Sequence, residues 1–135
     1  MTEVELAYVA GLFDGEGCVN IWKHNDRGVM RHRLRATLAN THKPFGEWLK
    51  REFGGSVTVY KSQQHKTLYT WSVYGKACAR FLGQIIPYLR LKQDQAVVAI
   101  EFQKRMIIPH GQMTQDEFDA RERLQNKMKE LKNVQ

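Results

Sequence analysis

The sequence predicts an α+β domain in which helices cover one face of an antiparallel sheet, with the order αββαββα and further helices at the C-terminal end. Three observations support this class. Some segments carry apolar residues at helical spacing, while others alternate apolar with polar residues. The alternating segments come in pairs joined by short polar turns. Helical segments separate the pairs, which favours hairpins packed under helices. We expect one domain over residues 1–135, with a core at about 3–108 and a helical extension at about 112–132.

The first predicted helix covers residues 3–13, after a capping box formed by Thr2 and Glu5. Its apolar residues lie almost all round the helix, so more than one side must be buried. We expect the domain core on one side and a partner subunit on the other. Gly15 and Gly17 are predicted to end the helix, because glycine accepts the left-handed conformation at helix C-termini.

A hairpin is predicted next, with strands at residues 19–23 and 31–40 and a turn containing Asn25, Asp26 and Gly28. In its second strand one face is apolar and points to the core. The opposite face carries a basic row, which Asn20, Trp22 and His24 of the first strand are expected to join. The members of the row are Arg31, Arg33, Arg35 and Thr37.

A helix after Pro44 leads to Gly54 and Gly55, which are expected to stop it. A second hairpin pairs residues 56–61 with 67–74. Helices are then predicted at 77–89 with a bend near Pro87, at 94–108 up to a stop at 109–111, and at 115–131 after a capping box of Thr114 and Glu117.

Composition and charge favour an anionic partner. The chain is 42% hydrophobic and 26% charged, and 21 basic against 14 acidic residues give a formal charge of +7. Nucleic acid is the commonest such partner and an anionic membrane surface its rival. No apolar run reaches the roughly 18 residues that span a bilayer, and the acidic start is unlike a signal peptide. We expect an intracellular protein that is not secreted, in a prokaryotic or phage-host cytoplasm or an organelle matrix, with no membrane partner. Cys18 and Cys78 indicate neither zinc nor a disulfide framework.

The basic face suits double-stranded DNA. Alternate strand residues lie about 6.6 Å apart, roughly two nucleotide steps of about 3.4 Å. A two-stranded ribbon fits the major groove, where arginine pairs with guanine and asparagine with adenine. The alternative is that these charges only keep an exposed sheet soluble and block edge pairing. The second hairpin adds further candidates for DNA contact, namely Thr58, Tyr60, Lys66, Thr70 and Ser72.

Residues 9–17, Val-Ala-Gly-Leu-Phe-Asp-Gly-Glu-Gly, resemble the LAGLIDADG nonapeptide of the homing endonuclease family. The departures are Val9, Phe13, Gly15 and Glu16, and all are conservative. The element order, the chain length and the basic sheet also match that family. The resemblance covers about residues 3–108.

This resemblance implies which residues form the site. The second acidic position, Glu16, and the carbonyl of Gly15 are the expected ligands of Mg²⁺ (or Mn²⁺), and no small-molecule cofactor is expected. The first acidic position, Asp14, is mainly structural in the family. Lys92, in a segment similar to the family's LKxKQ pattern, is expected near the scissile phosphate. His42 lies where relatives place a polar residue that positions water.

A single motif per chain implies a homodimer, because two strands must be cut. The resemblance places Ala7, Ala10, Gly11, Phe13 and Asp14 at the subunit interface. It implies a metal-dependent endonuclease that cuts both strands of a long pseudo-palindromic site to leave 3′ overhangs, in the service of intron homing. The alternative is a relative that binds nucleic acid without cleavage, as an RNA maturase or a DNA-binding regulator.

Overall fold

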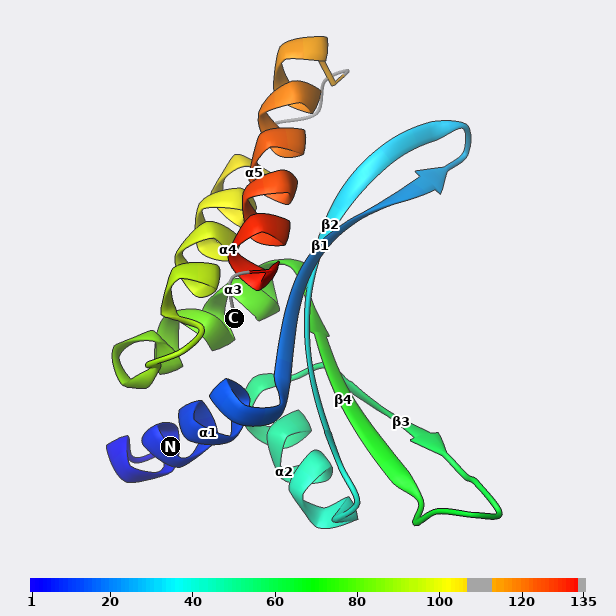
Figure 1. Ribbon diagram of the computed structural model, residues 1–135, viewed down its shortest axis with the longest axis vertical. Helices are drawn as coiled ribbons and strands as arrows, with labels where there is room; N and C mark the ends of the chain where they lie inside the picture. The colour runs from blue at the N-terminus through cyan, green and yellow to red at the C-terminus, as the bar shows by residue number, and fades with distance from the viewer. Residues whose placement is uncertain (107–112, 134–135) are drawn as a thin grey trace.

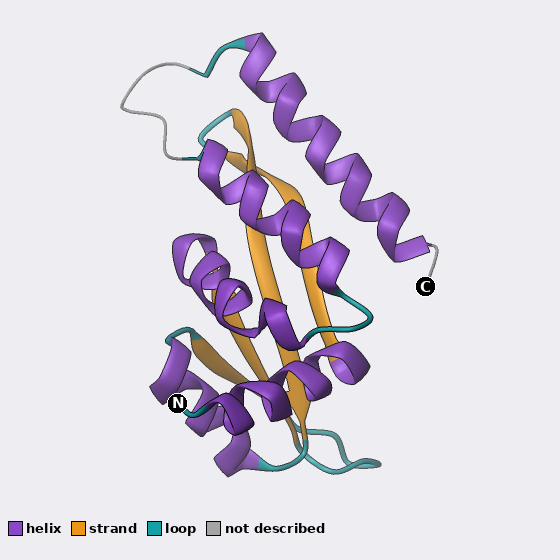
Figure 2. Cartoon of the chain, turned by 90° about the vertical axis from the view of Figure 1, so that its left-hand side faces the viewer, coloured by secondary structure: helices purple, strands orange, loops and turns teal. Residues whose placement is uncertain are grey.

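The computed structural model describes residues 1–106 and 113–133. Its helices lie on one side of the sheet, and the opposite side is open (Figures 1 and 2). The predicted α+β class and the order of its elements are confirmed. The elements are α1 (Glu3–Glu16), β1 (Gly17–Asp26), β2 (Val29–Asn40), α2 (Lys43–Phe53), β3 (Ser56–Tyr60), β4 (Leu68–Tyr74), α3 (Gly75–Ile85), the 3-10 helix η1 (Ile86–Tyr88), α4 (Gln93–Arg105) and α5 (Gln115–Asn133).

The four strands form one antiparallel sheet in the order β1-β2-β4-β3. Trp22 lies opposite Arg33 and Thr37 opposite Ser72. Residues that pair directly point to the same face, so the register confirms the basic row and its neighbours as one face. The other face is buried under the helices, through Val19, Ile21, Leu34, Ala36, Leu38, Trp71 and Val73. The sheet curves, so its basic face is concave (Figure 1).

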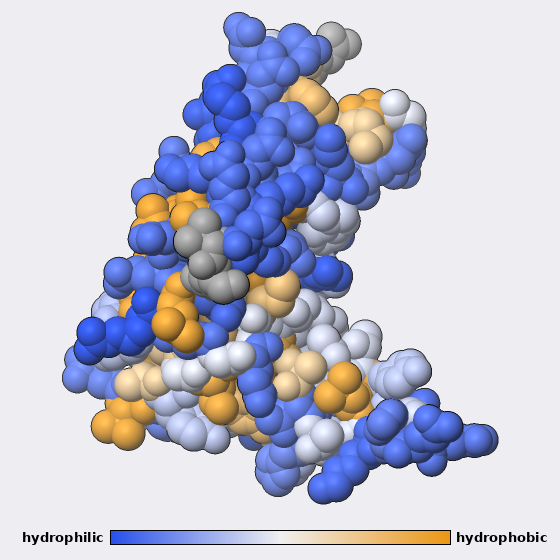
Figure 3. Space-filling model, viewed as in Figure 1, coloured by the Kyte–Doolittle hydropathy of each residue, from blue (hydrophilic) through white to orange (hydrophobic). Residues whose placement is uncertain are grey.

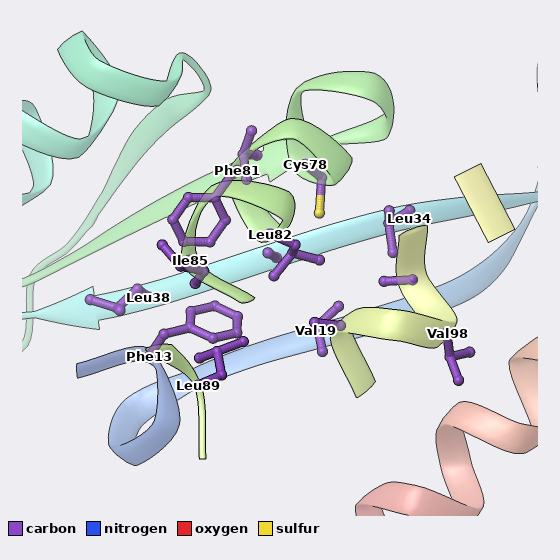
Figure 4. Packing of buried hydrophobic residues seen from close by; sticks show 14 of the residues in the cluster. Phe13, Val19, Leu34, Leu38, Cys78, Phe81, Leu82, Ile85, Leu89 and Val98 are labelled. Atoms are coloured by element: carbon purple, nitrogen blue, oxygen red, sulfur yellow. The ribbon is translucent and has the colours of Figure 1, made fainter. Parts of the chain in front are cut away.

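The core lies between the sheet and the helices (Figure 4). Phe81 of α3 is at its centre, with its ring centroid 5.5 Å from that of Phe13 and 4.8 Å from that of Trp71, both in edge-to-face geometry. Cys78 is buried beside it, and burial raises the pKa of this thiol to about 12. Leu124 and Met128 of α5 belong to the same hydrophobic cluster. The C-terminal helix is therefore packed into the core that the other elements share.

The end of α1 differs from the end predicted from its glycines. The helix runs on through Glu16, and neither Gly15 nor Gly17 has a positive φ. Gly17 is extended at φ −79°. A Cβ atom there would lie 2.3 Å from Cδ1 of Phe13. The position therefore needs glycine for the close approach of the Phe13 ring, and not for a left-handed turn.

Other boundaries shift by a few residues. The first hairpin is longer than predicted because its turn is only Arg27 and Gly28, both at positive φ, and the Gly28 N–H donates to Asn25 Oδ1 at 2.7 Å. The helix predicted at 77–89 starts two residues earlier and ends at Ile85, and η1 follows it. α4 ends at Arg105, and the predicted stop at 109–111 lies outside the described residues. No helix in the described ranges is long and apolar enough to cross a membrane.

Candidate active site and nucleic-acid interface

Asp14 ties the end of α1 to the loop that leads into α4. Its carboxylate accepts three successive backbone N–H groups, from Arg90 at 2.8 Å, Leu91 at 3.2 Å and Lys92 at 3.0 Å. Asp14 is only 9% exposed. Consecutive amides that converge on one carboxylate form a strong, charge-assisted contact. The side chain thus has an intramolecular structural role, linking residues 76 to 78 positions apart in the chain.

The same contact brings Lys92 to the end of α1. Lys92 Nζ donates to the backbone carbonyl of Asp14 at 2.6 Å, and the side chain is half-buried. Glu16 lies two residues further on, exposed in the last turn, and Gly15 beside it is also exposed. An ammonium and a carboxylate, both predicted site residues, are therefore held on one helix end.

His42 lies at the same end of the sheet. Gly17, directly after Glu16, pairs with Leu38 of β2, and His42 follows β2 as the residue before α2. Its backbone N–H donates to Asn40 Oδ1 at 2.8 Å, and its side chain is exposed and makes no cap hydrogen bond. The imidazole is therefore open to contact with a ligand.

The donor set at this end can form only part of a metal shell. Within residues 1–106 and 113–133, no three His, Cys, Asp or Glu side chains cluster closely enough to hold an ion. The oxygens that remain are the Glu16 carboxylate and the exposed backbone at Gly15. Mg²⁺ commonly binds through one or two carboxylates and completes its shell with water and substrate phosphate. The residues present fit an ion that is bound together with phosphate.

The outer face of α1 carries small and apolar residues that are open to solvent. Val4 is 80% and Tyr8 is 58% exposed, and Ala7 and Gly11 are exposed as well. The spacing of these residues places them on one stripe of the helix. This stripe, defined here as Val4, Ala7, Tyr8 and Gly11, is available for contact with another molecule.

Three residues predicted at a subunit interface require correction. Ala10 and Phe13 are fully buried within the chain, and the Asp14 carboxylate is committed to the loop before α4. Their side chains pack inward because these positions lie on the side of α1 that faces the core. Of the predicted set, Ala7 and Gly11 remain on the surface.

The concave face holds its arginines on aromatic rings. The guanidinium carbon of Arg33 lies 4.4 Å from the ring centroid of Tyr74 and 5.9 Å from that of Trp22, and that of Arg35 lies 5.1 Å from Trp22. Such cation–π contacts orient a guanidinium while its N–H groups stay free. This explains Trp22, which is unusual in a DNA groove. The Trp22 ring lies under the guanidinium groups of Arg33 and Arg35 and orients them through cation–π contacts.

Other residues of this face are placed as follows. Arg31 pairs with Asp26 at 3.2 Å near the hairpin turn. The Nε atom of Arg35 and the Nδ1 atom of His24 are buried and have no hydrogen-bond partner among the described residues. Thr37 is half-buried. In Figure 3 the surface is hollowed between the two hairpins; the second hairpin is predominantly hydrophilic, whereas the tip of the first also exposes the apolar Val29 and Met30.

The second hairpin supplies the other wall of this hollow. Thr58, Tyr60 and Lys66 are exposed, and Thr70 is half-buried. Ser72 needs correction as a DNA-contacting residue. It points to the concave face but is only 6% exposed, in the middle of the sheet where β2, β4 and β3 are all paired.

Two residues of this surface were missed from the sequence. Tyr74 follows Thr70 and Ser72 in the alternation of β4, so the strand pattern could have found it. Lys132 of α5 contacts Asn20 and its neighbours on β1. No local pattern signals this contact, because 112 residues separate Lys132 from Asn20.

The motif helix, the curved basic sheet and the helical cover define a known class. Residues 3–86 match the LAGLIDADG-like domain, and the chain belongs to the LAGLIDADG family of homing endonucleases. It is 30% identical over 125 residues to the DNA endonuclease I-CreI of Chlamydomonas reinhardtii, across 84% of this chain and 69% of that protein.

Solved structures show the same fold. The homing endonuclease I-CvuI, in complex with the I-CreI target in the presence of Mg, matches with a TM-score of 0.80 at 21% identity, over 96% of this chain and 82% of its own. The archaeal intron-encoded homing endonuclease I-Vdi141I, complexed with DNA, matches with a TM-score of 0.78 at 16% identity, over 96% and 84%.

Proposed function

We propose that this chain is a site-specific DNA endonuclease that acts as a homodimer and hydrolyses one phosphodiester on each strand of a long, pseudo-palindromic duplex, leaving 3′ overhangs. The observation that carries the proposal is the contact of the Lys92 ammonium with the Asp14 carbonyl, two residues before the exposed Glu16 in the last turn of α1. This end leads directly into β1 of the concave sheet, where Arg31 and Arg33 are exposed and Arg35 is half-buried. Intron homing is the role proposed for such cleavage.

Each residue has a separate task in this proposal. Lys92 has three N–H groups, of which one is donated to the Asp14 carbonyl, so two remain for a phosphate oxygen or the attacking water. His42 can orient that water from the other side, through a ring nitrogen. Glu16 and the Gly15 carbonyl would hold Mg²⁺ (or Mn²⁺) against the scissile phosphate. Such an ion lowers the pKa of bound water and stabilises the charge that develops on the phosphate.

The dimer follows from the number of acids and the surface of α1. One chain offers one exposed carboxylate at this site, whereas two scissile phosphates require two. A two-fold contact between α1 helices would place the two Glu16 residues on either side of its axis. The exposed stripe of Val4, Ala7, Tyr8 and Gly11 suits this contact, because the small Ala7 and Gly11 let two helices approach closely.

The concave face is proposed to bind duplex DNA. Arg33 and Arg35, supported by Trp22 and Tyr74, would read bases in the major groove. Arg31 and Lys66, nearer the ends of the hairpins, would contact the flanking duplex. Several cations must neutralise phosphates, so binding should weaken steeply as salt rises.

The test is cleavage of a randomised duplex library in the presence of Mg²⁺, followed by sequencing of the ends. We expect staggered breaks at one family of sites for the wild type and none for Glu16→Gln. Glu101→Gln, the same change at an exposed position of α4, is the matched control and should cut normally. If the wild type selects a site but never cuts it, the protein is a non-cleaving DNA-binding regulator or RNA maturase and the proposal is wrong.

A further inference from the structure

The C-terminal end of α5 meets the edge strand β1 at Lys132. Its ammonium lies 3.1 Å from the carbonyl oxygen of Val19 and 3.2 Å from Sγ of Cys18, and it donates to Oδ1 of Asn20. The Nδ2 atom of Asn20 in turn lies 3.5 Å from the same sulfur. Four side-chain and backbone groups thus form one polar cluster at the margin of the concave face.

The acceptors of this cluster use the hydrogen-bond donors of the Lys132 ammonium. A lysine has three N–H donors and no acceptor, and here three acceptors surround it, on Cys18, Val19 and Asn20. None of the three is a carboxylate, so the contact is not an ordinary salt bridge. Lys132 is half-buried, whereas Lys127 and Lys129 of the same helix are exposed. Its donors are therefore used inside the chain and are not free for a DNA phosphate.

The cluster also fixes the amide of Asn20. Because Lys132 only donates, it must face the oxygen of the amide and not its nitrogen, which removes the usual ambiguity of an asparagine side chain. Reading adenine requires the oxygen and the nitrogen of one amide to meet the base together. The oxygen of Asn20 is held against α5. What Asn20 can still offer to a groove is an N–H donor.

We propose that Lys132 is a specificity-determining positioning residue, which locks Asn20 as a hydrogen-bond donor toward the DNA. The locked amide can donate to O6 or N7 of guanine or to O4 of thymine, but it loses the second bond, accepted from N6, by which a free asparagine selects adenine. The C-terminal helix thereby sets base preference from outside the sheet. This inference rests on the proposed function, because it requires that the concave face binds duplex DNA.

The test is a binding selection from a randomised duplex library without divalent metal, so that cleavage does not interfere. Lys132→Met removes the donors and keeps the length of the side chain. We expect its preference at one base pair of each half-site to shift toward adenine by roughly 2- to 12-fold, the effect of one net hydrogen bond. Lys132→Gln keeps an N–H donor for Asn20 and should retain the wild-type preference. Lys129→Met removes an equivalent charge from an exposed position and should leave the profile unchanged.

A double-mutant cycle isolates the contact. Asn20→Ala should abolish discrimination at the same base pair, and adding Lys132→Met should change nothing more there. An unchanged profile in Lys132→Met would overturn the inference, as would an equal loss of affinity for all sequences, which would make Lys132 a phosphate contact. If the wild type itself selects no DNA sequence, the proposed function is wrong, and the inference on Lys132 falls with it.

A second measurement does not depend on how the variants fold. In NMR spectra of the wild type, the Lys132 ammonium protons should exchange slowly enough to be detected and should show a through-space contact to the Asn20 side chain. If the Lys132 ammonium protons exchanged with water as fast as those of Lys129, the proposed hydrogen bond between Lys132 and Asn20 would be contradicted.

Discussion

Removal of the Asp14 carboxylate should both destabilise the protein and disable its site. Asp14→Ala deprives three successive N–H groups, at residues 90, 91 and 92, of one shared acceptor. A hydrogen bond to a charged group contributes about 1.5–3 kcal/mol, and water can replace part of the set because Arg90 and Leu91 are exposed. We therefore expect a loss of about 3 kcal/mol in the free energy of unfolding. For a chain of 135 residues this corresponds to a fall in Tm of about 10 °C.

The assay is urea unfolding at a fixed protein concentration, because association alters apparent stability. Asp94→Ala, in the exposed first turn of α4, removes a carboxylate near the same loop and should cost less than about 1 kcal/mol. At a temperature where Asp14→Ala is folded, its cleavage rate should also fall, because Lys92 loses the contact that positions it. Equal stability losses in the two variants would refute this account of Asp14.

Three further predictions concern packing, pH and base reading. Gly17→Ala places a methyl group against the Phe13 ring and should cost about 1–3 kcal/mol in unfolding free energy, measured by chemical denaturation. Burial lowers the pKa of His32 below its ordinary value of 6.5, although Glu122 opposes this through a 2.8 Å hydrogen bond. The folded state therefore favours neutral His32, so stability should decline as pH falls below about 6.5, and His32→Phe should flatten that decline in thermal melts. Arg33→Ala should reduce discrimination at one base pair by about 1–3 kcal/mol in a binding selection.

Each of these has a matched control. Gly83→Ala adds a methyl group where nothing lies within 4 Å and should be neutral or slightly stabilising. His65→Phe changes an exposed histidine and should leave the pH dependence intact. Arg51→Ala removes an exposed charge from α2 and should not alter base preference. If a control variant showed the same change in unfolding free energy, pH dependence or base preference as its test variant, the corresponding prediction would be wrong.

The fold was predictable because its signals are local. Alternation in β2 separates Leu34, Ala36 and Leu38 from the arginines between them, and the register confirms the faces that this alternation assigned. Thr2 and Glu5 form the predicted capping box at the start of α1. At the start of α5 the Thr114 hydroxyl accepts the Glu117 N–H as predicted, whereas the Glu117 carboxylate pairs with Arg105 and Arg121. Both the strand alternation and the helix caps depend on residues that are close together in the sequence.

The errors concern contacts that the local pattern does not contain. An apolar helix such as α1 needs burial on several sides, but its sequence does not say which side meets the chain's own core, and Ala10 and Phe13 lie on that side. Ser72 alternates correctly, yet it is only 6% exposed. The task of Asp14 and the position of Lys132 depend on partners 76 to 114 residues away. These long-range contacts are visible only in the folded chain.

In the proposed dimer, each subunit supplies one Glu16 for one DNA strand. This arrangement is tested most directly with a mixed dimer, in which a wild-type subunit is co-purified with a differently tagged Glu16→Gln subunit and offered a supercoiled plasmid containing the selected site. We expect a nicked circle, cut on one strand only, with linear product from wild-type dimers alone. Linear product from the mixed dimer, or a protein that binds and cuts as a single chain, would contradict it.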